Sequence, residues 1–311
     1  MEQLYVFGTG NATQVNTITT AIDSALFNYG IIEKDSVGTL NLIIGIVLAI
    51  MIGMILLGGI KRIASVSQII VPFMAIIYFV FALTLVVCNI TKIPEAVVII
   101  VKAAFNPQAV AGGITGSMLV AMQKGVARGI FSNEAGLGSA PIAAAAAQTH
   151  EPVRQGLVSM TGTFIDTIVI CTMTGLSIVL TGAWKVDGLE GVQVTTYAFK
   201  NGLPFPAELS AFILMLCLVF FAFTTILGWD YYSERCLEYL TGGNMKKVKV
   251  FRWIYILAVF IGPYMTVSAV WVIADIFNGL MALPNMIALF VLSGVVAKET
   301  REFFKANKHL E

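Results

Sequence analysis

The stretch GVARGIFSNEAGLGSAPIAAAAAQTH, residues 125–150, decides how this chain folds. It places helix-breaking glycines and Pro141 beside the charged Arg128 and Glu134. In hydrocarbon an unsatisfied peptide group is costly, so such residues survive at membrane depth mainly where the backbone is buried in protein or lines a cavity. A broken helix with free N–H and C=O groups is suited to hold an amino acid and a coupling ion. We therefore interpret this stretch as a solute-binding site.

The rest of the chain has the composition of an integral membrane protein. Of its 311 residues 58% are hydrophobic and 12% are charged, whereas soluble domains carry about 25% charged residues. Runs of about 20 residues without Asp, Glu, Lys or Arg are long enough to cross a bilayer. Four such runs are Leu40–Ile60, Ile63–Thr91, Leu209–Trp229 and Trp253–Ala274. The net charge of +1 argues against nucleic acid as a partner.

Counting along the chain gives an all-α bundle in one transmembrane domain, residues 1–311. The predicted spans lie near 40–60, 66–90, 113–148, 155–184, 209–234, 251–273 and 284–303. A continuous helix over Gly113–Gln148 would be about 54 Å long, which exceeds a bilayer core of about 30 Å, so we expect a break near Ser132–Gly138. Ile93–Phe105 is too short to cross and is expected at the interface.

The basic residues predict the orientation of the spans. Threading the spans alternately places most lysines and arginines on one side, including Lys61, Arg62 and Lys298. That side should be cytoplasmic. The C-terminal tail is then inside, and residues 185–206 are outside.

The interrupted segment carries the candidate substrate groups. Ser132 and Asn133 offer side-chain hydrogen bonds, the glycines let backbone approach a ligand, and a Pro141–Ala147 half-helix presents a positive end to an anion. The alternative is a kinked packing helix whose small residues allow close helix contact. Arg128 and Glu134 need partners in a membrane. They pair with each other across the break, gate the cytoplasmic half, or form a purely structural ion pair.

Other polar residues in apolar spans are weaker candidates. Asp166 serves cation coupling or proton relay, or is satisfied by hydroxyls such as those of Thr163 or Thr167. Adjacent Thr224 and Thr225 offer oxygens to a monovalent cation, although membrane hydroxyls usually bond back to the i−4 carbonyl.

Two further positions concern the ligand pocket. Trp229 lies one turn after Thr225 and is placed to close an apolar pocket. Asn11 and Gln14 orient a ligand, or cap a helix and join neighbouring helices. With only His150 and His309 as histidines, the chain shows no HExxH metal motif. We expect neither an enzyme with catalytic residues nor a protein-bound metal centre.

Taken in order, these pieces resemble the alanine or glycine:cation symporter family, also called sodium:alanine symporters or amino acid carrier proteins. The motifs are FGTGNATQVN, GGIKRIASVSQIIVPFMA, GVARGIFSNEAGLGSAPIAAAAAQT, FIDTIVICTMTG, FTTILGWDYYSE and VIADIFNGLMALPN. They cover nearly the whole chain, and RGIFSNEAGLGSAPIA is highly specific. The resemblance implies a multi-pass protein of the cell (plasma) membrane.

The resemblance also implies a leucine-transporter-like bundle of the APC superfamily and sodium-coupled symport of alanine or glycine by alternating access, without a further cofactor. Residues 129–138 match the broken sixth core helix, which shares substrate contact. Thr224 and Thr225 match a sodium site, and Gln14 and Trp229 match the substrate pocket. The expected substrate-binding residues are Gln14, Gly129, Phe131, Ser132, Asn133, Gly136, Gly138 and Trp229.

The chain departs from the family pattern at its start. No ATVGTGNIAG-like stretch precedes FGTGNATQVN, so residues 1–28 match the end of the third core helix. The expectation is a partial bundle lacking the first two core helices and most of the third. Either a second chain supplies the missing helices, or the chain is a non-transporting fragment or assembly subunit of such a carrier.

Overall fold

The computed structural model describes residues 10–31, 36–105 and 113–307, and this part of the chain is helical with no strand. Within it, five helical segments are long and apolar enough to cross a membrane. They are α3 (Val37–Leu56), α4 (Gly59–Cys88), the run of α8 (Pro152–Phe164), π-helical η4 (Ile165–Cys171) and α9 (Thr172–Thr181), α11 (Ala207–Leu240) and α13 (Val267–Ala306).

Other helices connect and flank these spans. They are α2 (Thr13–Asn28), α5 (Ile93–Phe105), α6 (Gly113–Asn133), α7 (Ala140–Ala144), α10 (Val192–Gly202) and α12 (Met245–Ile261), with 3₁₀ turns η3 (Ile90–Lys92), η5 (Ala183–Lys185) and η6 (Gly262–Tyr264). The helix predicted over Ile93–Phe105 is confirmed as α5, and its place at the interface stays a prediction. Of the helix end predicted over residues 1–28, residues 1–9 lie outside the described part.

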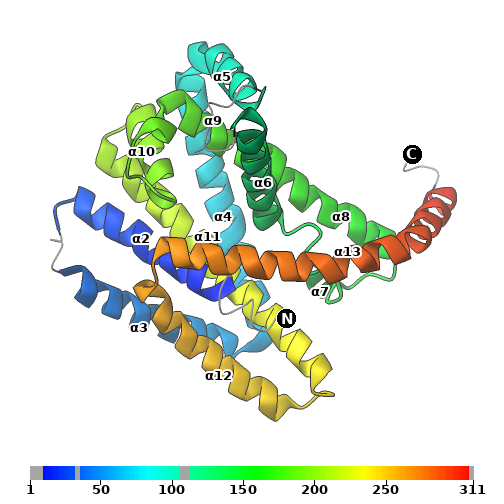
Figure 1. Ribbon diagram of the computed structural model, residues 1–311. Coiled ribbons are helices and arrows are strands. Elements are labelled where there is room, and N and C mark those ends of the chain that lie inside the picture. Colours follow the sequence, from blue (N-terminus) through cyan, green and yellow to red (C-terminus); the bar gives the residue numbers. More distant parts are fainter. Residues whose placement is uncertain (1–9, 32–35, 106–112, 308–311) are drawn as a thin grey trace.

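The long helix α11 runs through the body and organises the packing. It contacts α2, α3, α12, α4 and α10 (Figure 1). The main core lies where α11 meets α2, α3 and α12, and it includes the fully buried Ile18, Ile52, Ile226 and Tyr255. A second core joins α4, α10 and α11 through Leu85, Phe199 and Leu214.

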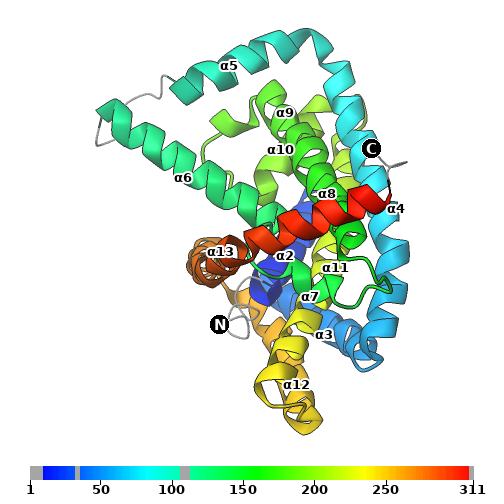
Figure 2. The same cartoon turned by 90° about the vertical axis from the view of Figure 1, so that its right-hand side faces the viewer.

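Helices α5 and α6 extend outward from different parts of the body and approach each other at their far ends (Figure 2). On α6, residues 119–124 are exposed, while residues 127–131 are half-buried where the helix returns to the body. The C-terminal end of α6 packs against η4. Packing of this end therefore positions the segment that follows Asn133.

The division of the last spans differs from the prediction. The expected spans 251–273 and 284–303 are replaced by α12, which ends at Ile261, and by the continuous α13. Pro284 lies inside α13, where neighbouring groups in a membrane protein can accommodate a proline. The chain turns instead at Gly262–Tyr264, and the Thr266 side chain caps α13 by accepting from the Ala269 N–H at 3.3 Å.

Gly262 is the tightest point of the contact between η6 and α2. A Cβ atom on Gly262 would lie 2.7 Å from the Cβ of Val15, which is itself fully buried. We predict that Gly262→Ala lowers the free energy of unfolding by about 1–3 kcal/mol, because the added methyl group overpacks the core. Thermal unfolding in detergent measures the effect.

Gly294→Ala is the matched control, since a Cβ there meets open space on the exposed side of α13. It should leave the unfolding temperature unchanged or raise it slightly, because alanine favours a helix by up to about 1 kcal/mol over glycine. Equal unfolding temperatures for the two variants would contradict the packing argument.

Candidate functional site

The helix break predicted near Ser132–Gly138 is confirmed. Helix α6 ends at Asn133 and α7 begins at Ala140. Between them Gly136 and Gly138 have φ of 86° and 90°, which favours glycine. Glu134 has φ of 56° and is the only residue other than glycine with positive φ in the described part of the chain. The backbone here is therefore held in a defined, non-helical conformation.

Side chains within the segment hold this conformation, through two hydrogen bonds and one residue that packs in the core. The Asn133 Oδ1 atom accepts from the Ala135 N–H at 2.8 Å, and the Ser139 hydroxyl donates to Glu134 Oε2 at 2.7 Å. Leu137, which is 2% exposed, anchors the loop in the main core. The Asn133 contact replaces one of the backbone bonds that the interrupted helix loses, and the other two contacts fix the path of the loop.

Ser132 and Asn133 turn toward the π-helical segment η4. The Ser132 hydroxyl donates to Asp166 Oδ2 at 2.7 Å, and the Asn133 amide donates to Thr167 Oγ1 at 2.9 Å. The Thr167 hydroxyl lies 3.4 Å from the same Asp166 oxygen. Asp166 is thus satisfied by hydroxyl groups, one of which, Thr167, the sequence had indicated. π-Helical turns are frequent at functional sites, and this one fixes the end of α6.

The opposite side of the break faces α11 through Trp229. The Trp229 side chain, 3% exposed, lies beside the Glu134 carboxylate and packs edge-to-face on Tyr232. A Cβ on Gly10 would lie 2.5 Å from Trp229 side-chain atoms, so the backbone just before α2 packs directly against the Trp229 side chain. Gln14, four residues further on, is half-buried on α2. The structure therefore brings the break, Trp229 and the start of α2 together.

Asn11 is fully buried and joins helices, which is one of the roles predicted for it. Its amide donates to the backbone carbonyl of Tyr255 on α12 at 3.0 Å. The contact ties the start of α2 to α12.

Thr224 and Thr225 lie on α11, one to two turns before Trp229. The Thr224 hydroxyl donates to the carbonyls of Phe220 and Phe221 at 3.0 Å each, and Thr225 donates to Phe221 at 2.9 Å. Both hydroxyls thus bond back to their own helix, as membrane hydroxyls usually do. A hydroxyl that donates keeps its two lone pairs, so both oxygens remain able to accept a cation.

The predicted pairing of Arg128 with Glu134 is wrong. Arg128 forms an ion pair with Asp275 on α13, and its guanidinium lies over the Trp271 ring, 4.4 Å from the centroid. Phe131 packs on the same ring, with centroids 4.9 Å apart. The Glu134 carboxylate instead accepts a hydrogen bond from the Ser139 hydroxyl and lies beside Trp229. The sequence indicated that Arg128 needs a partner, but Asp275 lies 147 positions away and only folding selects it.

The remaining predicted glycines differ in what surrounds them. A Cβ on Gly129 or Gly136 would meet open space, whereas on Gly138 it would lie 3.3 Å from Asn285 Oδ1 of α13. Gly138 therefore allows α13 to pass close to the interrupted backbone.

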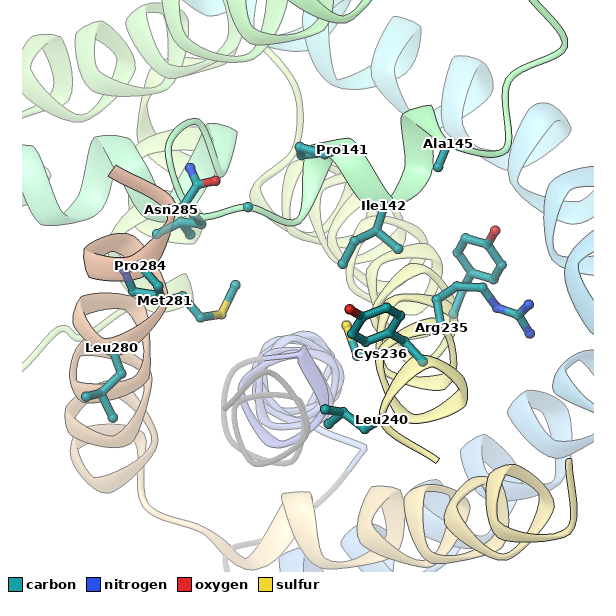
Figure 3. A pocket seen from close by; sticks show the side chains of 14 residues that line it. Pro141, Ile142, Ala145, Arg235, Cys236, Leu240, Leu280, Met281, Pro284 and Asn285 are labelled. Carbon is teal, nitrogen blue, oxygen red and sulfur yellow. The ribbon is translucent and has the colours of Figure 1, made fainter. Parts of the chain in front are cut away.

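A cleft of about 930 Å³ opens beside the break, between α7, α11 and α13 (Figure 3). Ile142 of α7 and Met281 of α13 point into it, while the Arg235 guanidinium turns away. Of the predicted substrate residues only Gly138 lines this cleft. Ser132 and Asn133 contact η4, and Phe131 contacts Trp271 of α13. Trp229 is buried on α11, Gln14 is half-buried on α2, and a Cβ on Gly129 or Gly136 would meet open space.

These features define a class: a multi-pass helical membrane protein with an interrupted helix packed against a long central span. Comparison with known proteins specifies it further, because the profile of the sodium:alanine symporter family matches residues 2–311. The chain belongs to this family, which consists of transporters rather than enzymes.

Curated relatives agree with this assignment. An uncharacterized transporter of Haemophilus influenzae is 52% identical over 97% of this chain and 63% of its own length. The sodium/alanine symporter AgcS of Methanococcus maripaludis is 45% identical, with the same coverage of both chains. A sodium/proton-dependent alanine carrier protein of a Bacillus species is 35% identical over 89% of this chain and 65% of its own length. The chain thus spans somewhat less than two thirds of the length of these relatives.

The ion pair between Arg128 and Asp275 gives a testable prediction. Their side chains are 36% and 33% exposed, so removing one charge leaves the other partly desolvated. In a double-mutant cycle with Arg128→Gln and Asp275→Asn, we expect a coupling free energy on the order of 1 kcal/mol. Chemical or thermal unfolding of the four proteins measures it.

The control cycle uses Arg154→Gln and Glu151→Gln, since this pair is 61% and 45% exposed. Exposed pairs contribute about 0–1 kcal/mol, so coupling near zero is expected there. Coupling no larger for Arg128–Asp275 than for the control would contradict the assignment.

Proposed function

We propose that this protein is a sodium-coupled symporter of a small neutral amino acid, alanine or glycine. The observation that best supports this proposal is the interrupted helix at Glu134–Ser139, whose non-helical backbone lies beside Trp229 and the start of α2. Family membership and the names of the relatives support the substrate and the ion.

The order of the helices supports a leucine-transporter-like bundle. With α2 as the end of the third core helix, α3 and α4 follow as the fourth and fifth. The α6–α7 pair is then the broken sixth, the run from α8 to α9 the seventh, and α11, α12 and α13 the last three. In such folds substrate and ion bind where a discontinuous helix exposes its peptide groups.

Within this arrangement the predicted residues take specific roles. The amino acid carboxylate would bind backbone N–H groups of the interrupted segment, where Gly136 and Ala140 are exposed. Trp229 closes the pocket from α11, and Gln14 borders it from α2. Sodium would bind the oxygens of Thr224 and Thr225, of which Thr225 lies on the same face of α11 as Trp229.

Coupling between sodium and the amino acid follows because both would bind to helix α11. A ligand shifts a conformational equilibrium only through its different affinity for the two states. Because Thr225 and Trp229 are one turn apart on α11, sodium and amino acid would bias the same helix against the α6–α7 break. Alternating access would then expose both to the cytoplasm, the side on which we place the C-terminal tail because of its lysines and arginines.

Uptake into proteoliposomes tests the proposal. Labelled alanine and glycine should accumulate against a concentration gradient when sodium is imposed outside, and should only equilibrate when potassium replaces it. Labelled glutamine and leucine measure whether the site accepts larger side chains. Accumulation of alanine and glycine that ignores the sodium gradient would refute sodium coupling.

The cation site gives a sharper prediction. Thr225→Val removes one oxygen ligand and keeps the side-chain shape, so the sodium concentration for half-maximal uptake should rise roughly tenfold, about 1.4 kcal/mol. Thr224→Val should act in the same direction. Sodium-activation curves at saturating alanine measure both.

Thr241→Val is the matched control. Its hydroxyl donates to the Leu237 carbonyl at 2.7 Å, the same back-bond that Thr225 makes, but at the far end of α11. It should leave sodium activation unchanged. An equal shift in Thr225→Val and Thr241→Val would assign the effect to helix stability rather than to ion binding.

A further inference from the structure

Asp230, on α11 next to Trp229, is a buried carboxylate without a hydrogen-bond partner. It is 1% exposed, and neither carboxylate oxygen has a hydrogen-bond donor among residues 10–31, 36–105 and 113–307, which the structure describes. An ionised carboxylate taken out of water costs several kcal/mol unless it is paired. In the described part of the chain, Asp230 therefore stands apart from Glu134 and Asp166, which both accept hydroxyl donors.

The guanidinium of Arg252, which is close enough to act on Asp230, is already paired with another carboxylate. Arg252 of α12 binds Glu234 with two nitrogen atoms, and its Nη2 atom lies 2.8 Å from Glu234 Oε2. Glu234 is one helical turn after Asp230, so two acidic groups share one guanidinium. The group of Asp230, Glu234 and Arg252, named here the α11–α12 cluster, carries one negative charge in excess when both carboxylates are ionised.

Neighbouring hydroxyls do not relieve this excess. The Tyr255 hydroxyl of α12, which also faces Asp230, donates to the Ile226 carbonyl at 2.8 Å. The Ser233 hydroxyl donates to the Trp229 carbonyl at 2.7 Å. Each hydroxyl has a single proton to donate, and both protons are directed at backbone oxygens rather than at Asp230.

We propose that Asp230 is a proton-binding site. One proton on its carboxyl group makes the α11–α12 cluster neutral while Glu234 stays ionised and paired with Arg252. The site is separate from the proposed sodium ligands Thr224 and Thr225, and it lies on the helix whose Trp229 contacts the break. A bound proton at this point would make the position of α11 depend on pH.

Infrared difference spectroscopy of the purified protein tests the site without any transport measurement. Wild-type protein in sodium-free buffer at neutral pH should show the C=O stretching band of a protonated carboxyl group. The band should vanish when the pH is raised and should be missing in Asp230→Asn, a nearly isosteric change. Asp187→Asn, at an exposed loop carboxylate, should keep the band.

Glu234→Gln is the decisive variant. It removes one negative charge and leaves Arg252 to balance Asp230, so Asp230 should ionise and the band should disappear although Asp230 is still present. A purely structural cluster predicts changed stability in these variants but no band that depends on both positions.

Two results would overturn the proposal. One is a wild-type spectrum without the band, or a band that stays the same in Asp230→Asn. The other is loss of the wild-type band on adding sodium at constant pH, which would assign Asp230 to a metal cation. Failure of the proposed symport would show separately, as sodium-independent uptake, and would leave the spectra unaffected.

Discussion

The structure depends on one constraint: a helix inside an apolar bundle is interrupted, and its freed backbone groups must be satisfied without water. Between Asn133 and Ala140 the chain meets part of this constraint locally: the Asn133 side chain accepts from the Ala135 N–H, and the Leu137 N–H donates to the Glu134 carbonyl. Two of the glycines provide the positive φ angles that the path requires. Because lipid offers no hydrogen bonds, these few contacts determine where the backbone remains open to a ligand.

Polar residues elsewhere in the bundle are arranged around this interruption. Ser132 and Asn133 tie it to η4, Trp229 ties it to α11, and Arg128 ties the preceding turn to α13. Three different neighbours thus hold one short segment. A shift of any of them changes the segment's surroundings, which is the mechanical requirement for a binding site that responds to conformational change.

The sequence predicted those features that arise from local chemistry. Glycines, a proline and charges within one apolar stretch were enough to predict the helix break. Long runs without charged residues were enough to predict a membrane protein. The partner of Arg128 was not predictable, because Asp275 is chosen by tertiary packing over a long separation. The last spans were misplaced because a proline usually ends or kinks a helix, whereas α13 continues through Pro284 and the chain turns at Gly262–Tyr264.

Charge balance separates two kinds of ionic contact in the bundle. Arg128 and Asp275 are matched one to one and stack on Trp271, so the pair is complete without a further ligand. At α11 and α12 one guanidinium faces two carboxylates, and the one left over is the more deeply buried. Burial of an unpaired charge is expensive enough that a protein retains it mainly where the charge changes during function. Helix α11 therefore places Trp229 against the helix break and, one residue further on, the unpaired carboxylate of Asp230.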